Sequence, residues 1–189
     1  MNTRLVGSEM CIRDSPDGHE LCLEMPGMHG NYTATTSIQN ADLLIAIGVR
    51  FDDRVTANPS FFAQNAKVIH ADIDPAEIGK VRDAQVPIVG DAKSVIKGLI
   101  EALGDEKLDT ENWVSELKEM KTEFPLSYKQ EDKGPLKVPY VLEELQKLTK
   151  EEAIVVAGVG QHQMWVSQHW NFTEPNTWLN SGGLGTMGY

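Results

Sequence analysis

Two short apolar runs constrain the fold of this sequence more than any other feature. They occupy residues 42–49 (DLLIAIGV) and 67–73 (KVIHADI). Nearly unbroken apolar runs of this length are typical of strands buried on both faces, as in parallel sheets that helices cover on either side. With a third short strand predicted at residues 86–89, the sequence indicates an α/β fold with a parallel sheet.

Capping residues and apolar spacing predict the helices that separate these strands. One helix is expected over residues 32–40, and another after Asp74, where Pro75 and Glu77 suit the first turn. Asp91 is expected to cap a longer helix that ends at Gly104. Its apolar stripe consists of Val95, Ile96, Leu99, Ile100 and Leu103.

A second βαβ block is predicted further along the chain. Between residues 105 and 137 lie many charged residues and one predicted surface helix, which suits an interdomain connection. Pro139 then opens a helix, followed by a strand at 153–157, a turn at 158–160, a helix at 161–170 and a strand at 177–180. We therefore expect one domain over 21–104, a connection over 105–137 and a second domain beginning at 138.

The bulk properties exclude several kinds of protein. The net charge of -11 argues against a nucleic-acid partner, because phosphate backbones are held by clustered basic residues. No apolar run is long enough to cross a membrane. The cysteines, Cys11 and Cys22, form neither a disulfide framework nor a metal-binding pattern. The cysteine pattern fits a reducing compartment, so we expect a cytoplasmic protein with no membrane partner.

The two ends of the sequence suggest a truncated gene. Residues 1–15 have no periodicity, and GSEMCIRDS resembles translated adapter sequence, so we expect a non-native leader that extends at most to residue 20. At the other end, Tyr189 follows a glycine-rich segment directly.

Residues that follow the predicted strands are candidates for ligand binding, because ligands of open parallel sheets collect at the carboxyl ends of strands. After the first strand, Gly48 allows close approach to the backbone, and Arg50 and Arg54 suit phosphate or carboxylate. A capped turn with surface ion pairs explains the same residues equally well. Asp72 and Asp91 suit ribose hydroxyls, but turn and cap roles explain them too.

Glycine-rich turns are the stronger candidates. A strand followed by Gly158-Val159-Gly160 and a helix start presents free N–H groups to a diphosphate, and Gln161 and His162 add side-chain donors. Residues 181–188 (SGGLGTMG) predict tight backbone geometry, although a structural turn is the alternative. The loop 27–30 (GMHG) could line a flavin, but it carries little weight alone.

Taken in order, GMHG, GVRFDDRV, HADIDPAEIGK, GDA, GVGQHQMW and NSGGLGTMGY resemble the acetolactate synthase catalytic subunit over roughly residues 25–189. The resemblance implies part of an FAD-binding middle domain followed by the start of a thiamine-diphosphate-binding domain. It implies FAD contacts at Met28, His29, Gly48, Val49, Arg50, Asp52, Arg54, Val55, Asp72, Ile73, Gly90, Asp91 and Ala92. It implies thiamine diphosphate contacts at Val159, Gly160, Gln161, His162, Gly185 and Met187.

The resemblance also implies a reaction and partners. In this family thiamine diphosphate activates pyruvate, carbon dioxide leaves, and the remainder adds to pyruvate or 2-oxobutyrate on the way to valine, leucine and isoleucine. FAD is held mainly as a structural element. The catalytic glutamate and the Mg2+ ligands lie in segments absent from this chain, so no catalytic or metal-binding residue is expected here. A homodimer or homotetramer and a small regulatory subunit are the implied protein partners.

Two other readings remain open at this point. One is a neighbouring thiamine-diphosphate carboligase or decarboxylase, against which RFDDR and QHQMW speak. The other is a non-catalytic nucleotide-binding module. If the resemblance to acetolactate synthase holds, we expect the isolated chain to be inactive and to associate, because its predicted sheets are incomplete.

Overall fold

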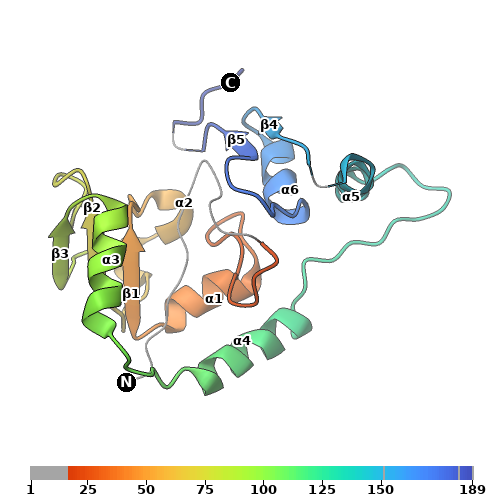
Figure 1. Cartoon of the computed structure of the whole chain (residues 1–189). Helices are drawn as coiled ribbons and strands as arrows, with labels where there is room; N and C mark the ends of the chain where they lie inside the picture. The colour runs from red at the N-terminus through yellow and green to blue at the C-terminus, as the bar shows by residue number, and fades with distance from the viewer. Residues whose placement is uncertain (1–16, 151, 183, 189) are drawn as a thin grey trace. The chain divides into compact units, whose positions relative to one another are not determined.

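The structure is a computed structural model that describes residues 17–150, 152–182 and 184–188. The predicted non-native stretch 1–15 lies outside the described residues. The chain divides into two compact units (Figure 1). Unit 1 comprises residues 26–124, and unit 2 comprises residues 17–25 together with the residues from 125 onward. Each unit is described by itself.

A parallel sheet forms the centre of unit 1, as the sequence predicts. Its strands β1 (Leu43–Ile47), β2 (Lys67–Asp72) and β3 (Val86–Val89) lie in the order β1-β2-β3. Deep burial alternates along β1 and most of β2, whereas β3 is a largely exposed edge strand. The prediction of strands buried on both faces is therefore wrong in part. The predicted α/β class is confirmed.

Among the described residues of unit 1, five helical segments accompany this sheet, and a side chain caps the first turn of all but the last of them. They are α1 (Tyr32–Asn40), α2 (Asp53–Thr56), the 3-10 turn η1 (Pro59–Phe61), α3 (Ala92–Leu103) and α4 (Glu111–Glu123). Asn31 caps α1 by accepting a hydrogen bond from the Ala34 amide at 2.7 Å. The core beneath them contains Ala63 and Val68, both fully buried.

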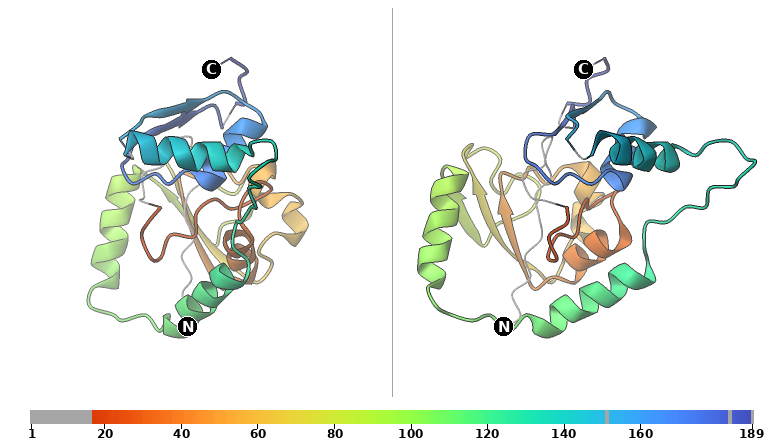
Figure 2. Two further views of the ribbon diagram at one scale, coloured as in Figure 1. Left: turned by 90° about the vertical axis from the view of Figure 1, so that its right-hand side faces the viewer. Right: turned by 45° about the vertical axis from the view of Figure 1, so that its right-hand side comes forward.

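The helix α4 packs against α1 inside unit 1 (Figure 2). The rings of Tyr32 and Phe124 lie 4.4 Å apart, and Trp113 and Leu117 are buried. The apolar spacing that predicted this helix therefore marks a packed face. The helix α4 belongs to unit 1, and the residues after Phe124 belong to unit 2.

The helix predicted after Asp74 does not form, and that prediction is wrong. Residues 75–79 make turns, although Asp74 Oδ1 accepts the Ala76 amide at 2.9 Å as a cap would. The segment offers no apolar stripe for a helix to bury, and Gly79 takes a positive φ of 75° that ends it. A good capping sequence is thus insufficient without a buried face.

The helix α3 forms where the sequence predicts it, but its apolar stripe is not buried. Asp91 caps the helix and Gly104 ends it, yet no residue of α3 is buried. Ile100, for example, is 65% exposed. A stripe of this kind normally faces a core, so this side of unit 1 presents apolar surface.

Unit 2 contains a second, smaller parallel sheet. The strands β4 (Val155–Ala157) and β5 (Trp178–Asn180) pair in parallel, and α5 (Val138–Thr149) packs against α6 (Gln161–His169). The rings of Phe172 and Trp178 lie 5.3 Å apart in its core. Asp17 joins this core, because its amide donates to the Phe172 carbonyl at 2.9 Å.

No helix in the part of the chain that the structure describes has both the length and the apolar character needed to cross a membrane.

Candidate functional site

The carboxyl ends of the three strands of unit 1 lie along one edge of the sheet. Ile47 pairs with Ala71, and Asp72 pairs with Val89. The ladder continues one residue further, because the Gly48 amide donates to Ala71 O at 2.8 Å and the Gly90 amide donates to Asp72 O at 3.0 Å. The strand-end residues predicted to contact FAD therefore share one edge.

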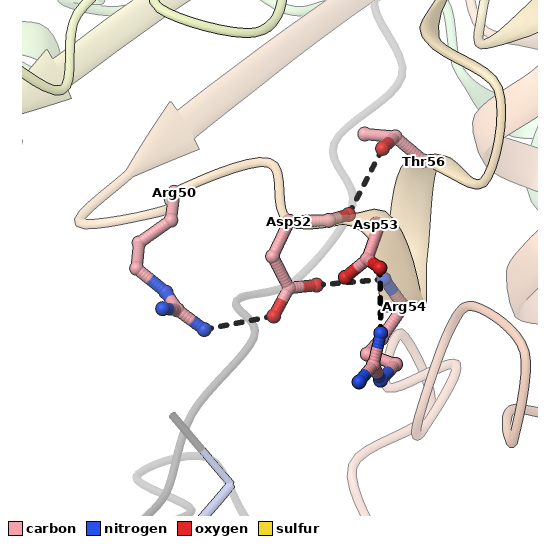
Figure 3. A network of polar contacts seen from close by, with 5 residues as sticks. All are labelled: Arg50, Asp52, Asp53, Arg54 and Thr56. Atoms are coloured by element: carbon pink, nitrogen blue, oxygen red, sulfur yellow. Dashed lines mark hydrogen bonds and ion pairs between the residues drawn. The ribbon is translucent and has the colours of Figure 1, made fainter. Parts of the chain in front are cut away.

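Charged side chains gather in the turn between β1 and α2 (Figure 3). Arg50 contacts Asp52 at 2.8 Å, and Arg54 contacts Asp53 at 2.6 Å. Asp52 also caps α2, accepting the Arg54 amide at 3.1 Å. This is the capped turn with surface pairs that the sequence left open. Such exposed pairs contribute less than about 1 kcal/mol, so a phosphate could replace a carboxylate as partner at little cost.

Gly48 leaves its side of this turn accessible. Its φ is 64°, and a Cβ built there would meet nothing within 4 Å. The acidic candidates at the same edge are held by local bonds: Asp72 Oδ1 accepts the Asp74 amide at 2.9 Å, and Asp91 accepts the Ser94 amide at 3.1 Å.

The loop at residues 27–30 lies against the start of α2. The Met28 amide donates to Arg54 O at 2.7 Å. Gly27 has a φ of 90°, and a Cβ there would stand 2.5 Å from the same carbonyl oxygen, so only glycine permits this approach. Met28 is 64% exposed. The structure thus brings the GMHG and RFDDR motifs together, which sequence spacing could not establish.

In unit 2 a glycine turn joins β4 to α6. Gly160 is the N-cap residue of α6 with a φ of 152°, and none of the side chains that the structure describes caps the helix. Its carbonyl accepts the Gln163 amide at 3.1 Å, so the helix begins immediately after the glycine. The His162 ring folds back over the turn, where a Cβ on Gly160 would lie 3.0 Å from His162 Cε1. This is the predicted arrangement of strand, glycine turn and helix start.

The strands β4 and β5 end side by side, since Ala157 pairs with Asn180. The segment after β5 therefore begins at the same edge of the second sheet as the glycine turn after β4. Gln163 Nε2 donates to Asn180 Oδ1 at 3.0 Å. Ser181 organises the following loop: its carbonyl accepts the Gly185 amide at 2.9 Å, and its hydroxyl accepts the Thr186 amide at 2.9 Å.

The chain matches two domain models of one enzyme family. Residues 10–99 match "Thiamine pyrophosphate enzyme, central domain", and residues 158–189 match "Thiamine pyrophosphate enzyme, C-terminal TPP binding domain". The chain belongs to the thiamine pyrophosphate enzymes. The second match begins at the glycine turn described above.

Within the thiamine pyrophosphate enzymes, the chain is similar to acetolactate synthases. It is 52% identical over 188 residues to the acetolactate synthase large subunit of Corynebacterium glutamicum, covering 98% of this chain and 30% of that protein. It is 53% identical over 178 residues to an acetolactate synthase of Mycobacterium leprae, covering 92% and 28%. A probable chloroplastic acetolactate synthase of Oryza sativa subsp. japonica is 44% identical, covering 95% and 28%. The resemblance predicted from the sequence is confirmed, over about a third of the relatives' length.

No three metal-binding side chains come together in this thiamine pyrophosphate enzyme, within the residues that the structure describes.

Two side chains of unit 2, Tyr128 and His169, have shifted pKa values. Tyr128 donates a hydrogen bond to Glu143 Oε2 at 2.7 Å, which raises the pKa of Tyr128 to about 12. Burial lowers the pKa of His169, whose ring lies 5.7 Å from that of Tyr128. These contacts attach the segment before α5 to the rest of unit 2, and they indicate a structural role.

Sequence reasoning missed several residues that shape the two edges. His70, Phe51, Asn180 and Ser181 are among them. A signal exists for His70 only, since a histidine inside an apolar strand needs a hydrogen-bond partner. The others depend on contacts between segments that the sequence does not place side by side.

Proposed function

We propose that the protein to which these residues belong is an acetolactate synthase, which condenses pyruvate with pyruvate or 2-oxobutyrate and releases carbon dioxide. The names of its relatives and the identity of 52% to one of them support this activity. Because the chain spans only 30% of that relative's length, the activity is assigned to the whole protein and not to this polypeptide alone. A bacterial cytoplasmic location, 2-oxo acid substrates, a homo-oligomer and a small regulatory subunit belong to the same proposal.

The observation that carries the proposal is the turn between β4 and α6. The backbone angles of Gly160, φ 152° and ψ -168°, lie in a region that essentially only glycine adopts. The helix α6 begins there, and no described side chain caps it. The amides at the start of a helix and the positive end of its dipole favour an anion such as a diphosphate. The residues present therefore fit thiamine diphosphate.

In this proposal the residues of unit 2 bind and orient the cofactor. The backbone at Val159 and Gly160, with Gln161 and His162, holds the diphosphate. The loop that Ser181 organises brings Gly185 and Met187 toward the aminopyrimidine; Met187, 75% exposed, offers an apolar surface for it. When bound, thiamine diphosphate supplies the electron sink for decarboxylation, and the protein positions it.

Unit 1 is proposed to hold FAD at the carboxyl edge of its sheet. The exposed guanidinium groups of Arg50 and Arg54 suit the phosphates, and the open side of Gly48 admits close approach. The remaining proposed contacts are Met28, His29, Val49, Asp52, Val55, Asp72, Ile73, Gly90, Asp91 and Ala92. FAD is assigned a structural part, with no redox step in the condensation.

A chimeric enzyme tests the proposed activity. Residues 21–189 would replace the aligned segment of the Corynebacterium glutamicum acetolactate synthase large subunit. The assay measures the acetolactate that the chimera forms from pyruvate. We expect the chimera to form acetolactate and to require added thiamine diphosphate. A matched chimera carrying Gly160→Ala is expected to need at least about tenfold more cofactor for half-maximal activity.

The outcome separates the competing functions. A chimera that folds and binds FAD but forms no acetolactate, while releasing carbon dioxide from a 2-oxo acid, would indicate a decarboxylase. A folded chimera that binds neither cofactor would contradict the proposal.

A further inference from the structure

His70 occupies an unusual place for a polar residue. It lies in β2, is 1% exposed and is among the largest fully buried side chains of the described residues. Its Nε2 lies 2.8 Å from the carbonyl oxygen of Val49. Because a carbonyl oxygen can only accept, Nε2 must carry the proton, and Nδ1 meets no hydrogen-bond partner among the residues that the structure describes. The imidazole is thus committed to a single hydrogen bond.

That hydrogen bond crosses from one strand to the turn after its neighbour. The register pairs His70 with Ala46, so Val49 lies three residues beyond the position opposite His70. Gly48 has a φ of 64°, which bends the chain after β1 and brings the Val49 carbonyl within reach. The His70 side chain therefore fixes where the turn goes after the strand ends.

A second contact fixes the same turn one step further along. Phe51 has a φ of 53°, which bulky residues rarely adopt, yet it is only 4% exposed. The centroid of its ring lies 5.0 Å from that of the His70 ring and 5.9 Å from that of the Phe62 ring. Both pairs are T-shaped. Burial of the ring holds a backbone conformation that would otherwise be unfavourable.

We infer that His70 and Phe51 form a clamp beneath the turn at residues 48–52 and are positioning residues for the nucleotide-binding edge of unit 1. The clamp holds the turn so that Arg50 and the start of α2 face outward. This inference rests on the proposed FAD site for its ligand, but the clamp itself rests on geometry within unit 1. Neither residue is assigned a contact with the nucleotide.

Substitutions at His70 separate the hydrogen bond from the volume of the side chain. Glutamine places its Nε2 the same number of bonds from the backbone, whereas leucine fills space without a donor. Val68→Ala is the matched control, since Val68 is 0% exposed and lies two residues away on the same face of β2. It removes volume from the core that Val68 shares with Phe51, but it leaves the His70 hydrogen bond and the ring contact between His70 and Phe51 in place.

The experiment uses the full chain with FAD as the probe. Flavin fluorescence gives the FAD Kd, amide hydrogen exchange reports on residues 49–55, and ring 15N shifts report the His70 tautomer. We expect His70→Leu to speed exchange in the turn and weaken FAD binding, each about tenfold, and His70→Gln to restore both to within about threefold. Val68→Ala should lower Tm while leaving the FAD Kd within about twofold.

Three results would overturn the inference: a proton on Nδ1 in place of Nε2, unchanged exchange in His70→Leu, or equal loss in the glutamine and leucine variants. A different result would separate the clamp from its ligand. If neither the unsubstituted chain nor any variant binds FAD, but amide exchange in residues 49–55 is faster in His70→Leu than in His70→Gln, the clamp is supported and the proposed FAD site is contradicted.

Discussion

The side-chain amide of Gln163 donates to Oδ1 of Asn180 at 3.0 Å, joining the first turns of α6 to the end of β5. Gln163 follows the glycine turn closely in sequence, and Asn180 immediately precedes the serine that organises the second loop. Asn180 is only 7% exposed. This bond therefore links the two backbone segments that we propose for cofactor binding.

Removing the donor is expected to loosen both segments. Gln163→Met keeps the length of the side chain and removes this hydrogen bond, which should cost about 0.5–1.5 kcal/mol of unfolding free energy. Urea unfolding measures the loss, and thiamine diphosphate binding should weaken with it. Gln64→Met, at an exposed glutamine in unit 1, should change neither quantity. Equal behaviour of the two variants would contradict the proposed link.

A Cβ at Gly160 should disturb the diphosphate site directly. Gly160→Ala forces an unfavourable backbone conformation and a contact 3.0 Å from His162 Cε1, at a cost of about 1–3 kcal/mol. Gly98→Ala is the opposite case, since Gly98 lies inside α3 with nothing within 4 Å of the added Cβ. That change should stabilise the chain by about 0.5–1 kcal/mol. Thermal unfolding of both variants checks the contrast.

Arg54 and Arg82 should separate ligand binding from stability. The Arg54–Asp53 pair is exposed, with side chains 59% and 74% accessible, so Arg54→Gln should change stability by less than about 0.5 kcal/mol. If Arg54 holds a phosphate of FAD, the same change should raise the FAD Kd about tenfold. Arg82 instead donates to the carbonyls of Ala63 and Ala66 at 3.2 Å. Arg82→Gln should therefore lower stability and spare FAD binding.

The parallel sheets and most helices could be predicted because their signals are local. Buried strands need continuous apolar residues, and α3 begins and ends at residues that cap helices wherever they occur. The segment after Asp74 shows the limit of this reasoning, because its capping residues are correct but it carries no apolar stripe for a helix to bury.

The candidate site could be predicted only as separate pieces. The sequence indicates which turns suit an anion, but the contact of Met28 with Arg54 joins residues far apart in the chain. The same is true of His70 and Val49. Such contacts follow from strand register and turn direction, which a single sequence does not specify.

The hydrogen bond between Tyr128 and Glu143 predicts a pH dependence of stability. The pKa of Tyr128 rises from 10.0 to about 12 in the folded chain. Since the folded value is the higher one, the contribution is complete below pH 10 and is lost as the pH rises toward 12. Urea unfolding across this range should show a steeper decline for the unsubstituted chain than for Tyr128→Phe. Parallel pH profiles would show that the hydrogen bond contributes nothing.

We propose above all that the turn between β4 and α6 binds a diphosphate. The most direct test is to titrate the chain with thiamine diphosphate and to follow the backbone amide signals by NMR. We expect the largest shifts on Gly160, Gln161 and His162 and smaller shifts after Ser181, and we expect Gly160→Ala to raise the thiamine diphosphate concentration at half-maximal shift at least about tenfold. Shifts confined to unit 1, or an unchanged response in Gly160→Ala, would contradict it.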